Sequence, residues 1–357
     1  MSQPEFHTLP LADLRQETPD AVSIAFAVPE GLRAAYRFTP GQYLTLRATI
    51  DGEDLRRSYS ICSGLDDGEL RIAAKRVEGG VFSNWLNDAL RPGDTLQVMT
   101  PMGRFGIPPA PGRPQTYVAF AAGSGITPVL SIIKTVLAQE PASRVFLFFG
   151  NRNTQSILFR DQLEDLKDRY LSRLSVLHVL SREQQDIAAS NGHLNAEKLR
   201  YLLPGILPPA AIDQALICGP LAMIEGLEPA LLGLGIPRER VHVERFTPAP
   251  GIRRRPVVVA PDAPPKALAT IIHEGARITI PMAGAATIID AALRAGLNLP
   301  YSCKGGMCCT CRAKLLEGQV AMELNFSLEP WETAAGYVLT CQSRPVTDTL
   351  VVDYDQV

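Results

Sequence analysis

The sequence contains no apolar run that approaches the length needed to span a bilayer, and its first ten residues, MSQPEFHTLP, contain no basic segment followed by an apolar core. It also carries no excess of positive charge, because 35 basic and 37 acidic residues give a formal net charge of −2. This balance argues against non-specific binding to nucleic acid. Internal repeats and low-complexity tracts are absent as well. We therefore expect neither a membrane nor a nucleic acid as a partner.

Cysteine is scarce, with seven residues in 357, but four of them follow an informative spacing. Cys303, Cys308 and Cys311 are arranged as C-x4-C-x2-C, the spacing of a plant-type [2Fe–2S] ferredoxin, and Cys341 can supply the fourth thiolate. Two glycines between the first two cysteines would let backbone amides approach the cluster sulfurs. The spacing predicts a [2Fe–2S] cluster on these four cysteines, and reduced thiolates favour the cytoplasm.

Two other uses of these cysteines agree less well with the sequence. A structural zinc site usually has two close pairs of cysteines, whereas only Cys308 and Cys311 form such a pair here. A disulfide framework is typical of short secreted chains. Cys309 would break the spacing if it were a ligand, and Cys62 stands apart and is interpreted as a small buried residue.

The length allows two or three domains, and the pattern of residues changes along the chain. Up to about residue 111, short β-rich runs alternate with Pro-Gly and Asp-Gly turns, which predicts a small antiparallel β-barrel. Strands and helices then alternate, which predicts an α/β domain with a parallel sheet. The expected barrel strands are 22–28, 43–48, 58–62, 70–77 and 95–99; the later strands are 116–121, 145–149, 174–180 and 215–218, with helices at 129–138 and 157–169.

A proline-rich segment precedes the cysteine-rich end of the chain. Six of the eighteen residues in 248–265 are proline, and residues 253–255 are three consecutive arginines. We interpret this segment as a stiff, solvated linker, although the arginines could also dock on an acidic partner. Beyond it, strand-like runs at 267–273 and 277–281 and a helix at 288–295 fit a small α+β ferredoxin module. The predicted domains are therefore 1–111, 112–247 and 266–357, with the linker at 248–265.

The barrel segment contains Arg57-Ser58-Tyr59-Ser60, followed by Gly79-Gly80-Val81-Phe82-Ser83. Arg-x-Tyr-Ser alone could be a chance strand, but the pair of motifs resembles the ferredoxin–NADP reductase superfamily. That resemblance implies that Arg57 pairs with a flavin phosphate, that Tyr59 lies along the isoalloxazine face, and that Ser60 hydrogen-bonds near the hydride-accepting N5.

The second of these motifs would open a helix, expected at 82–90. The N-terminus of a helix binds phosphate through its free amides, which favours FAD, with its pyrophosphate, over FMN. The cofactor-binding candidates that this motif adds are Gly80, Val81, Phe82 and Ser83.

Another glycine loop, Ala122-Gly123-Ser124-Gly125-Ile126-Thr127-Pro128, lies where an expected strand meets an expected helix. It differs from the G-x-G-x-x-G fingerprint because proline takes the last position, yet its glycines could receive a diphosphate in the same way. The superfamily carries this variant together with a later Cys-Gly-Pro at the nicotinamide, here Cys218-Gly219-Pro220. The candidates are Gly123, Gly125, Thr127, Pro128, Cys218, Gly219 and Pro220.

Ser60 and Cys218 are the catalytic candidates, because the resemblance places both on the hydride path. We assign no nucleophilic chemistry to Cys218, which could equally be a small residue that fits beside the nicotinamide ring.

Ser181 and Arg182, just after an expected strand, bear on the choice of nicotinamide. A hydroxyl and a guanidinium suit the 2′-phosphate of NADPH, whereas an acidic residue on the ribose diol would suit NADH. Plant-type NADP reductases have the same Ser-Arg pair, followed by a lysine and a tyrosine. This chain has Asn191 and His193 instead, so its phosphate site departs from the family pattern. NADPH is favoured and NADH stays the alternative.

The order of the domains resembles that of reductase components of multicomponent oxygenases. Further stretches resemble the group that serves phenylacetyl-CoA 1,2-epoxidases, over nearly the full length of the chain. This resemblance implies electron flow from NADPH through FAD and the cluster to a separate di-iron oxygenase, and it places Phe246 near the flavin. No pair of Glu-x-x-His motifs for a di-iron site occurs in this chain. The stretches are 36–42, 150–152, 244–246, 290–294, 320–323 and 336–342.

Two alternative functions stay open. The acceptor could be another aromatic-ring hydroxylase or a demethylase. A non-catalytic redox sensor would use the cluster, but it would leave the Ser-Arg and Cys-Gly-Pro elements without a role.

Overall fold

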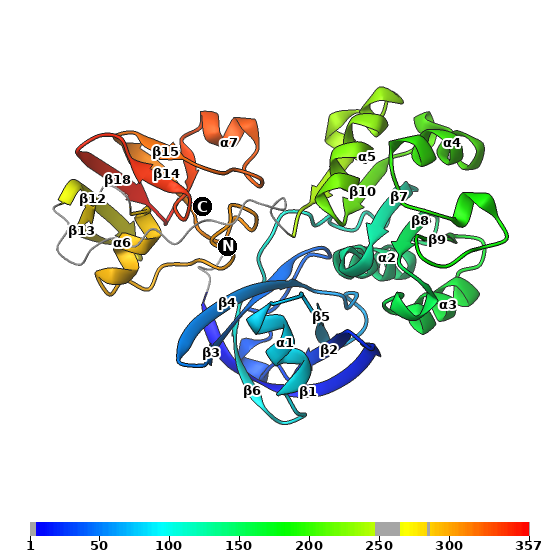
Figure 1. The fold of residues 1–357 in the computed structure, drawn as a ribbon, viewed down its shortest axis with the longest axis horizontal. Helices are drawn as coiled ribbons and strands as arrows, with labels where there is room; N and C mark the ends of the chain where they lie inside the picture. Colours follow the sequence, from blue (N-terminus) through cyan, green and yellow to red (C-terminus); the bar gives the residue numbers. More distant parts are fainter. Residues whose placement is uncertain (1–4, 247–264, 284–285, 357) are drawn as a thin grey trace. The chain divides into compact units, whose positions relative to one another are not determined.

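The computed structural model describes residues 5–246, 265–283 and 286–356, which fall into two compact units (Figure 1). One unit is Glu5–Phe246, and the other contains the described residues from 265 onward. The predicted linker, 248–265, lies outside the described residues except for its last residue. No helix in these described ranges is both long and apolar enough to cross a membrane.

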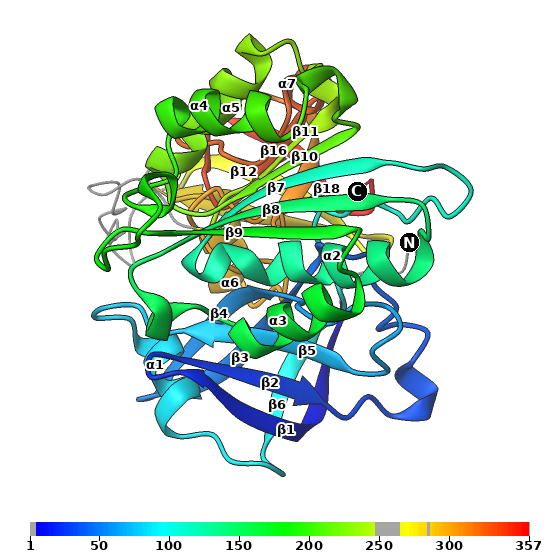
Figure 2. The same cartoon turned by 90° about the vertical axis from the view of Figure 1, so that its right-hand side faces the viewer.

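The first unit begins with an antiparallel barrel of six strands in the order β4-β3-β6-β1-β2-β5 (Figure 2). A bridge between Ile61 and Ile72 joins the end of β4 to β5 and closes the sheet on itself. Apolar side chains from all six strands fill the interior, which confirms the predicted barrel. Its elements are β1 (Phe6–Thr18), β2 (Ala21–Phe26), β3 (Tyr43–Ile50), β4 (Glu53–Ser60), β5 (Leu70–Lys75), α1 (Val81–Asp88) and β6 (Thr95–Met99).

Strand β1 has no counterpart among the predicted runs, because Pro10 and scattered polar residues interrupt its apolar pattern. Its first part pairs with β6, ending at Pro10 opposite Thr95. From Leu11 onward the strand pairs with β2 instead. The proline therefore lies where the strand changes its partner, a position at which a missing N–H is tolerated.

Residues 116–244 form a parallel sheet in the order β11-β10-β7-β8-β9, with helices on both faces (Figure 2). Alternate residues of β7 serve the two faces: Tyr117 and Ala119 pack with α2 and α3, whereas Val118 and Phe120 pack with α4 and α5. This doubly wound arrangement confirms the predicted α/β fold. Its elements are β7 (Thr116–Ala122), α2 (Ile126–Gln139), β8 (Arg144–Asn151), α3 (Arg160–Arg169), β9 (Leu174–Leu180), α4 (Ala196–Ile206), β10 (Gln214–Cys218), α5 (Leu221–Gly233) and β11 (Val241–Glu244).

Several helices of this domain differ from the predicted ones. The helix expected at 129–138 begins at Ile126, so its N-terminus directly follows the glycine loop. The helix expected at 157–169 begins only at Arg160, because Phe159 has a left-handed backbone conformation (φ 57°). Helices α4 and α5 were not expected, since each contains a proline, Pro204 or Pro229, that obscures the helical pattern.

The second unit contains a five-stranded sheet in the order β13-β12-β18-β14-β16 and a separate β15-β17 pair. Its central β12 and β18 are parallel, and α6 packs its buried residues, such as Ile288 and Ala292, into the core of this unit. This is the predicted α+β ferredoxin fold of the β-grasp type. The elements are β12 (Pro265–His273), β13 (Ala276–Ala283), α6 (Ile288–Arg294), β14 (Arg312–Glu317), β15 (Val320–Met322), α7 (Pro330–Ala334), β16 (Tyr337–Leu339), β17 (Ser343–Pro345) and β18 (Thr349–Asp353).

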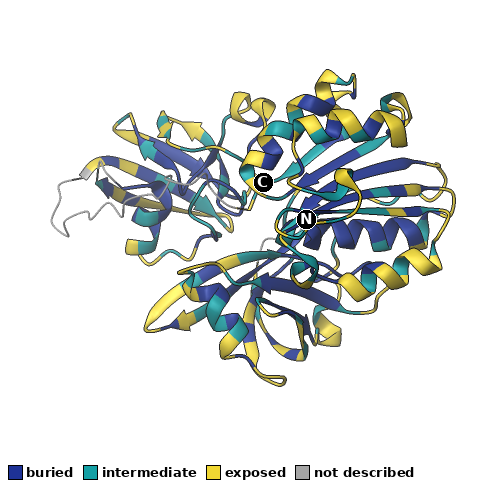
Figure 3. Ribbon diagram, turned by 45° about the vertical axis from the view of Figure 1, so that its right-hand side comes forward, coloured by how far each residue is buried: buried dark blue, intermediate teal, exposed yellow. Residues whose placement is uncertain are grey.

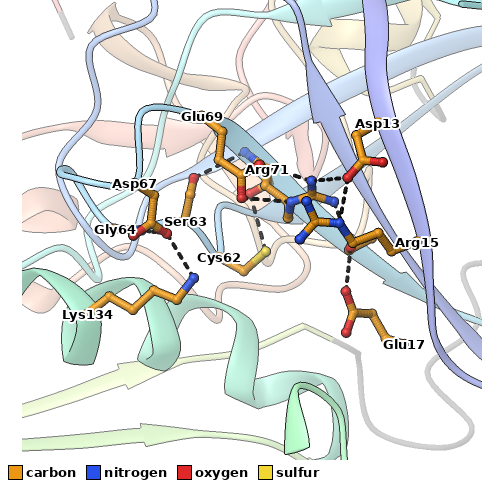
Figure 4. Close-up of polar contacts among 11 residues, drawn as sticks. Asp13, Arg15, Glu17, Cys62, Ser63, Gly64, Asp67, Glu69, Arg71 and Lys134 are labelled. Atoms are coloured by element: carbon orange, nitrogen blue, oxygen red, sulfur yellow. Dashed lines mark hydrogen bonds and ion pairs between the residues drawn. The ribbon is translucent and has the colours of Figure 1, made fainter. Parts of the chain in front are cut away.

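A buried arginine ties three strands of the barrel together (Figure 4). Figure 3 shows how far the strands of the first unit are buried. Arg71, on β5, is only 1% exposed. Its guanidinium donates to both carboxylate oxygens of Glu69 (2.8 and 2.9 Å), to the Ser23 hydroxyl on β2 (2.9 Å) and to Asp13 on β1. The hydrogen bond from Arg71 lowers the pKa of Asp13.

Replacement of Arg71 should therefore cost far more stability than replacement of Arg15, which pairs with the same Asp13 but is 54% exposed. We expect Arg71→Met to lower the free energy of unfolding by about 3 kcal/mol, because the buried Ser23 hydroxyl and two partly buried carboxylates lose their donor. We expect Arg15→Met to lower it by less than about 1 kcal/mol. Urea titrations of the full chain, followed by tryptophan fluorescence, check this. Equal losses in the two variants would contradict it.

Candidate functional site

The Arg-x-Tyr-Ser motif lies on β4, next to the bridge that closes the barrel. Because side chains alternate along a strand, Arg57 and Tyr59 lie on one face of β4 and Ser60 on the other. Arg57 is exposed and donates to the Arg56 carbonyl (2.7 Å), whereas Tyr59 is half-buried and Ser60 is buried. Burial raises the pKa of the Tyr59 phenol. The two residues predicted to hold flavin are therefore side by side on one face.

The glycine element lies next to this motif, because the rings of Tyr59 and Phe82 are 6.2 Å apart. Gly80 caps α1, which begins at Val81 and ends at Asp88 rather than spanning 82–90. A Cβ on Gly80 would come within 2.9 Å of the Ser83 hydroxyl. No described side chain caps this helix, so its first backbone amides can donate hydrogen bonds to a phosphate.

The side chains of two predicted binding residues in α1 have structural contacts. Phe82 is only 1% exposed and packs in the barrel core. The Ser83 hydroxyl accepts a hydrogen bond from the Val77 amide (3.1 Å). Both residues can therefore offer a ligand their backbone amides more readily than their side chains.

The two nucleotide motifs of the second domain contact each other directly. Cys218 pairs with Ala121 across the adjacent strands β10 and β7. A Cβ on Gly125 would lie 2.1 Å from the Cys218 carbonyl oxygen, and one on Gly219 would lie 3.1 Å from the Ala122 Cβ. A side chain cannot fit at Gly125 and would be tight at Gly219, so the two loops come together where side chains are missing.

The glycine loop leads straight into α2. Gly123 has φ +53°, and Gly125 caps the helix without a capping side chain from any described residue. The Thr127 hydroxyl donates to the Ser124 carbonyl (2.9 Å), and Pro128 is buried in the first turn. After the neighbouring strand β10, Pro220 caps α5. The amides at the start of α2 are thus in place for a diphosphate.

Cys218 is fully buried, and burial raises the pKa of its thiol well above the usual value. It is therefore not poised as a nucleophile. Its partner on β11 is Glu244, whose pKa burial raises to about 8. Glu244 was not among the predicted site residues, although a carboxylate that ends a strand could have drawn attention to it. Phe246, the last described residue of this unit, is 36% exposed.

The predicted 2′-phosphate residues follow β9 and lie beside the end of β8. The Ser181 amide donates to the Asn151 carbonyl (3.0 Å) and the Arg182 amide to the Arg152 carbonyl (2.7 Å), while the Arg182 side chain is exposed. The carboxylate of the following Glu183 binds Thr154, because it accepts hydrogen bonds from the Thr154 amide (2.7 Å) and hydroxyl (2.6 Å). These hydrogen bonds lower the pKa of Glu183.

Asn191 and His193 take the positions of the lysine and tyrosine of plant-type reductases. The Asn191 side chain accepts from the Gln185 amide (2.7 Å) and donates to the Gln185 carbonyl (2.8 Å), so it closes the loop after β9. His193 is exposed. Asn191 therefore has a structural role in its own loop. Among the residues predicted to bind the 2′-phosphate, Arg182 is the one with a positive charge.

The four predicted cysteines form two pairs in the second unit. A hydrogen bond from the Cys308 thiol lowers the pKa of Cys303 to about 6, and one from Cys311 lowers the pKa of Cys341. A [2Fe–2S] cluster takes four thiolates shared between two irons, so two pairs are the expected arrangement. Among the described residues, no three or more His, Cys, Asp or Glu gather as a site for one ion.

Donors surround these sulfur atoms. The Gly305 amide donates to Cys303 (3.3 Å), the Thr310 hydroxyl to Cys308 (3.2 Å) and the Gln342 side chain to Cys341 (3.4 Å). Such donors stabilise thiolate and cluster sulfur. The residues present therefore fit the cluster.

Two further cysteines have hydrogen bonds to backbone carbonyls. Cys309 has φ +53°, and its thiol donates to the Ser327 carbonyl (3.3 Å). Cys62 is buried in the first unit, where its thiol donates to the Arg71 carbonyl. All seven cysteines lie in the described ranges, and none of them forms a disulfide.

A buried ion pair beside the cysteine loop was not predicted. Arg312, directly after Cys311, lies 2.9 Å from the fully buried Glu332 of α7 and stacks on the Tyr337 ring (3.6 Å). The pair fixes α7 to β14, the strand that begins directly after the third cysteine. Only the folded structure brings these residues together, since Arg312 and Glu332 are far apart in sequence.

Comparison with protein families agrees with this geometry. Residues 8–107 match the oxidoreductase FAD-binding domain, 120–228 the oxidoreductase NAD-binding domain and 271–346 the 2Fe-2S iron-sulfur cluster binding domain. The three matches confirm the predicted flavin, nicotinamide and ferredoxin domains. They fall inside the three predicted segments, whose boundaries stay predictions.

Two curated relatives span nearly the whole chain. One component of the 1,2-phenylacetyl-CoA epoxidase of Escherichia coli is 49% identical over 98% of both chains, which confirms the predicted resemblance. The ferredoxin reductase component of 3-ketosteroid-9-alpha-monooxygenase from Rhodococcus rhodochrous is 36% identical over 95% of this chain and 94% of its own. Among solved structures, phthalate dioxygenase reductase shares the fold, with a TM-score of 0.60 and 23% identity over 98% of both chains.

The pairing of the cysteines leads to a test with two adjacent residues. Cys308→Ser should lose most of the iron and acid-labile sulfide, because one iron loses a thiolate. Cys309→Ser should keep both, because that thiol is directed at Ser327. Metal and sulfide analysis with visible spectra checks the pair. Loss in Cys309→Ser, or full retention in Cys308→Ser, would contradict the assignment.

Proposed function

The chain belongs to the FAD- and NAD-binding oxidoreductases with a 2Fe–2S domain that form reductase components of multicomponent oxygenases, and we propose that it delivers electrons from NADPH to a di-iron phenylacetyl-CoA 1,2-epoxidase. The observation that supports this acceptor best is the 49% identity along 98% of both chains to the epoxidase component of E. coli. The Cys-Gly-Pro and Ser-Arg elements support catalysis over a non-catalytic redox sensor, which would need neither.

The chemistry that FAD and the cluster supply when bound is the conversion of a two-electron hydride into single electrons. This chain holds the reactants in place. The exposed guanidinium of Arg57 and the first amides of α1 suit the charges of FAD, and Tyr59 on the same face suits its ring. We keep Ser60 and Cys218 as the residues beside the reacting atoms.

The nicotinamide side is built from the contact between Gly125 and the Cys218–Gly219 peptide. The start of α2 binds the diphosphate, and the buried Cys218 shapes the ring pocket. Glu244 lies beside Cys218 on the adjacent strand, and desolvation raises the pKa of its carboxyl, which we place at the edge of this pocket. Phe246 follows on the same segment and covers the flavin.

We place the reaction in the cytoplasm because reduced thiolates are needed to assemble the cluster. We also retain the domain boundaries 1–111, 112–247 and 266–357. They are supported by the family matches at 8–107, 120–228 and 271–346, each of which lies within one segment.

Arg182 should decide between the two nicotinamides. We expect Arg182→Ala to lower kcat/KM for NADPH about 10- to 100-fold, the effect of losing a charge-assisted hydrogen bond, and to change kcat/KM for NADH less than about twofold. Ferricyanide reduction with each donor measures both. Arg200→Ala, an exposed arginine on α4, is the matched control. Equal losses with both donors would contradict the assignment, and a wild-type preference for NADH would refute NADPH as the donor.

Reconstitution with purified oxygenase components tests the acceptor. With the epoxidase component, we expect NADPH oxidation that depends on phenylacetyl-CoA and is coupled to its epoxidation. With a 3-ketosteroid oxygenase component, suggested by the 36% identical relative, we expect at least about tenfold slower coupled turnover, since docking faces discriminate between partners. Faster coupled turnover with the steroid enzyme would reassign the acceptor.

A further inference from the structure

A barrel loop that follows the flavin strand packs against α2, the helix that starts at the dinucleotide loop. This loop, residues 61–67, follows β4 directly after Ser60 and lies against α2 (Figure 4). Helix α2 begins at Ile126, just after the glycine turn. The contact between the loop and the helix therefore joins the two predicted binding elements within a few residues of each.

Buried hydrogen bonds fix this contact. The Ser131 hydroxyl donates to the Ser63 carbonyl (2.6 Å), and the Leu65 amide donates to the Thr135 hydroxyl oxygen (3.1 Å). The Thr135 hydroxyl in turn donates to the Ser131 carbonyl (2.9 Å). Ser63, Ser131 and Thr135 are at most 1% exposed. Apolar contacts alone would let the two surfaces slide, whereas directional hydrogen bonds in a dry interface set one register.

Gly64 makes the approach close. A Cβ at this position would lie 2.7 Å from the Cβ of Lys134 on α2. Its backbone does not require glycine, because it is not among the residues with positive φ. The missing side chain therefore allows the loop and the helix to approach each other closely. At the rim of the contact, Lys134 pairs with Asp67 (2.8 Å) and Gln139 with Asp66 (3.0 Å).

The helix can transmit this register to the dinucleotide loop. From Ser131 to Ile126 it is continuous, a distance of about 7.5 Å along its axis. On the other side, only two residues, Ile61 and Cys62, separate Ser63 from Ser60. We propose that Gly64, Ser131 and Thr135 are positioning residues that set the spacing between the flavin strand and the dinucleotide loop for hydride transfer. This rests on the proposed function, since it requires NADPH to reduce a flavin bound by this unit.

The sharpest test adds a methyl group without removing a contact. We expect Gly64→Ala to slow the reduction of bound flavin by NADPH about 10- to 100-fold in stopped-flow measurements, as a displacement near 1 Å can. The KM for NADPH and the FAD content should stay within about twofold of wild type, because each binding element is intact by itself. Gly112→Ala is the matched control, since its Cβ would meet no described heavy atom within 4 Å. It should behave as wild type.

A second variant removes the Thr135 hydroxyl, and with it the hydrogen bonds to the Leu65 amide and the Ser131 carbonyl, and it provides a readout other than activity. Thr135→Val should speed amide hydrogen exchange at Leu65 at least about tenfold and slow flavin reduction. The conservative Thr135→Ser keeps the hydroxyl and should restore both. If Gly64→Ala fails to fold or loses FAD, the Thr135 pair decides.

The outcomes separate the two claims. If neither NADPH nor NADH reduces the flavin of the wild-type protein, the proposed function fails. If the wild type is reduced but Gly64→Ala and Thr135→Val react at the wild-type rate, while Leu65 exchange rises in Thr135→Val, the contact has only a structural role and this inference is overturned.

Discussion

The first unit depends on the packing of α2, which is buried on several sides. Eleven of its fourteen residues are buried. They share one hydrophobic cluster with barrel residues such as Cys62 and Phe105 and with sheet residues such as Tyr117 and Val145. The barrel and the parallel sheet therefore have a common core, and they cannot separate without exposing it to water. The proposed flavin and nicotinamide elements are built at the two sides of this core, so their relative position is part of the fold.

Local patterns predicted the parts of the protein whose chemistry demands fixed residues at fixed spacing. The C-x4-C-x2-C run and its distant fourth cysteine were enough to predict a 2Fe–2S domain, because two irons need thiolates at closely defined positions. The glycine loop and Cys-Gly-Pro were predictable for a similar reason, since a side chain at Gly125 would collide with the neighbouring strand. Alternation of strands and helices sufficed for the fold class.

Features that arise from long-range contacts could not be predicted. Arg71 gains its partners from β1 and β2, and Arg312 meets Glu332 only after the second unit has folded. Proline misled prediction at β1, α4 and α5, because tertiary packing tolerates it there. The position of Glu244 beside Cys218 follows from the pairing of β10 and β11, which no motif encodes. Asn191 similarly has a visible role only once its bonds to Gln185 are seen.

An anaerobic titration with NADPH, followed by visible and electron paramagnetic resonance spectra, tests the central claim most directly. One bound flavin and one cluster together take three electrons, so about 1.5 equivalents of NADPH should bleach both chromophores. The cluster should then give the resonance of a reduced [2Fe–2S] centre with one unpaired electron. Protein loaded with flavin and iron whose flavin bleaches while this resonance stays absent would contradict an electron path from nicotinamide through flavin to the four cysteines.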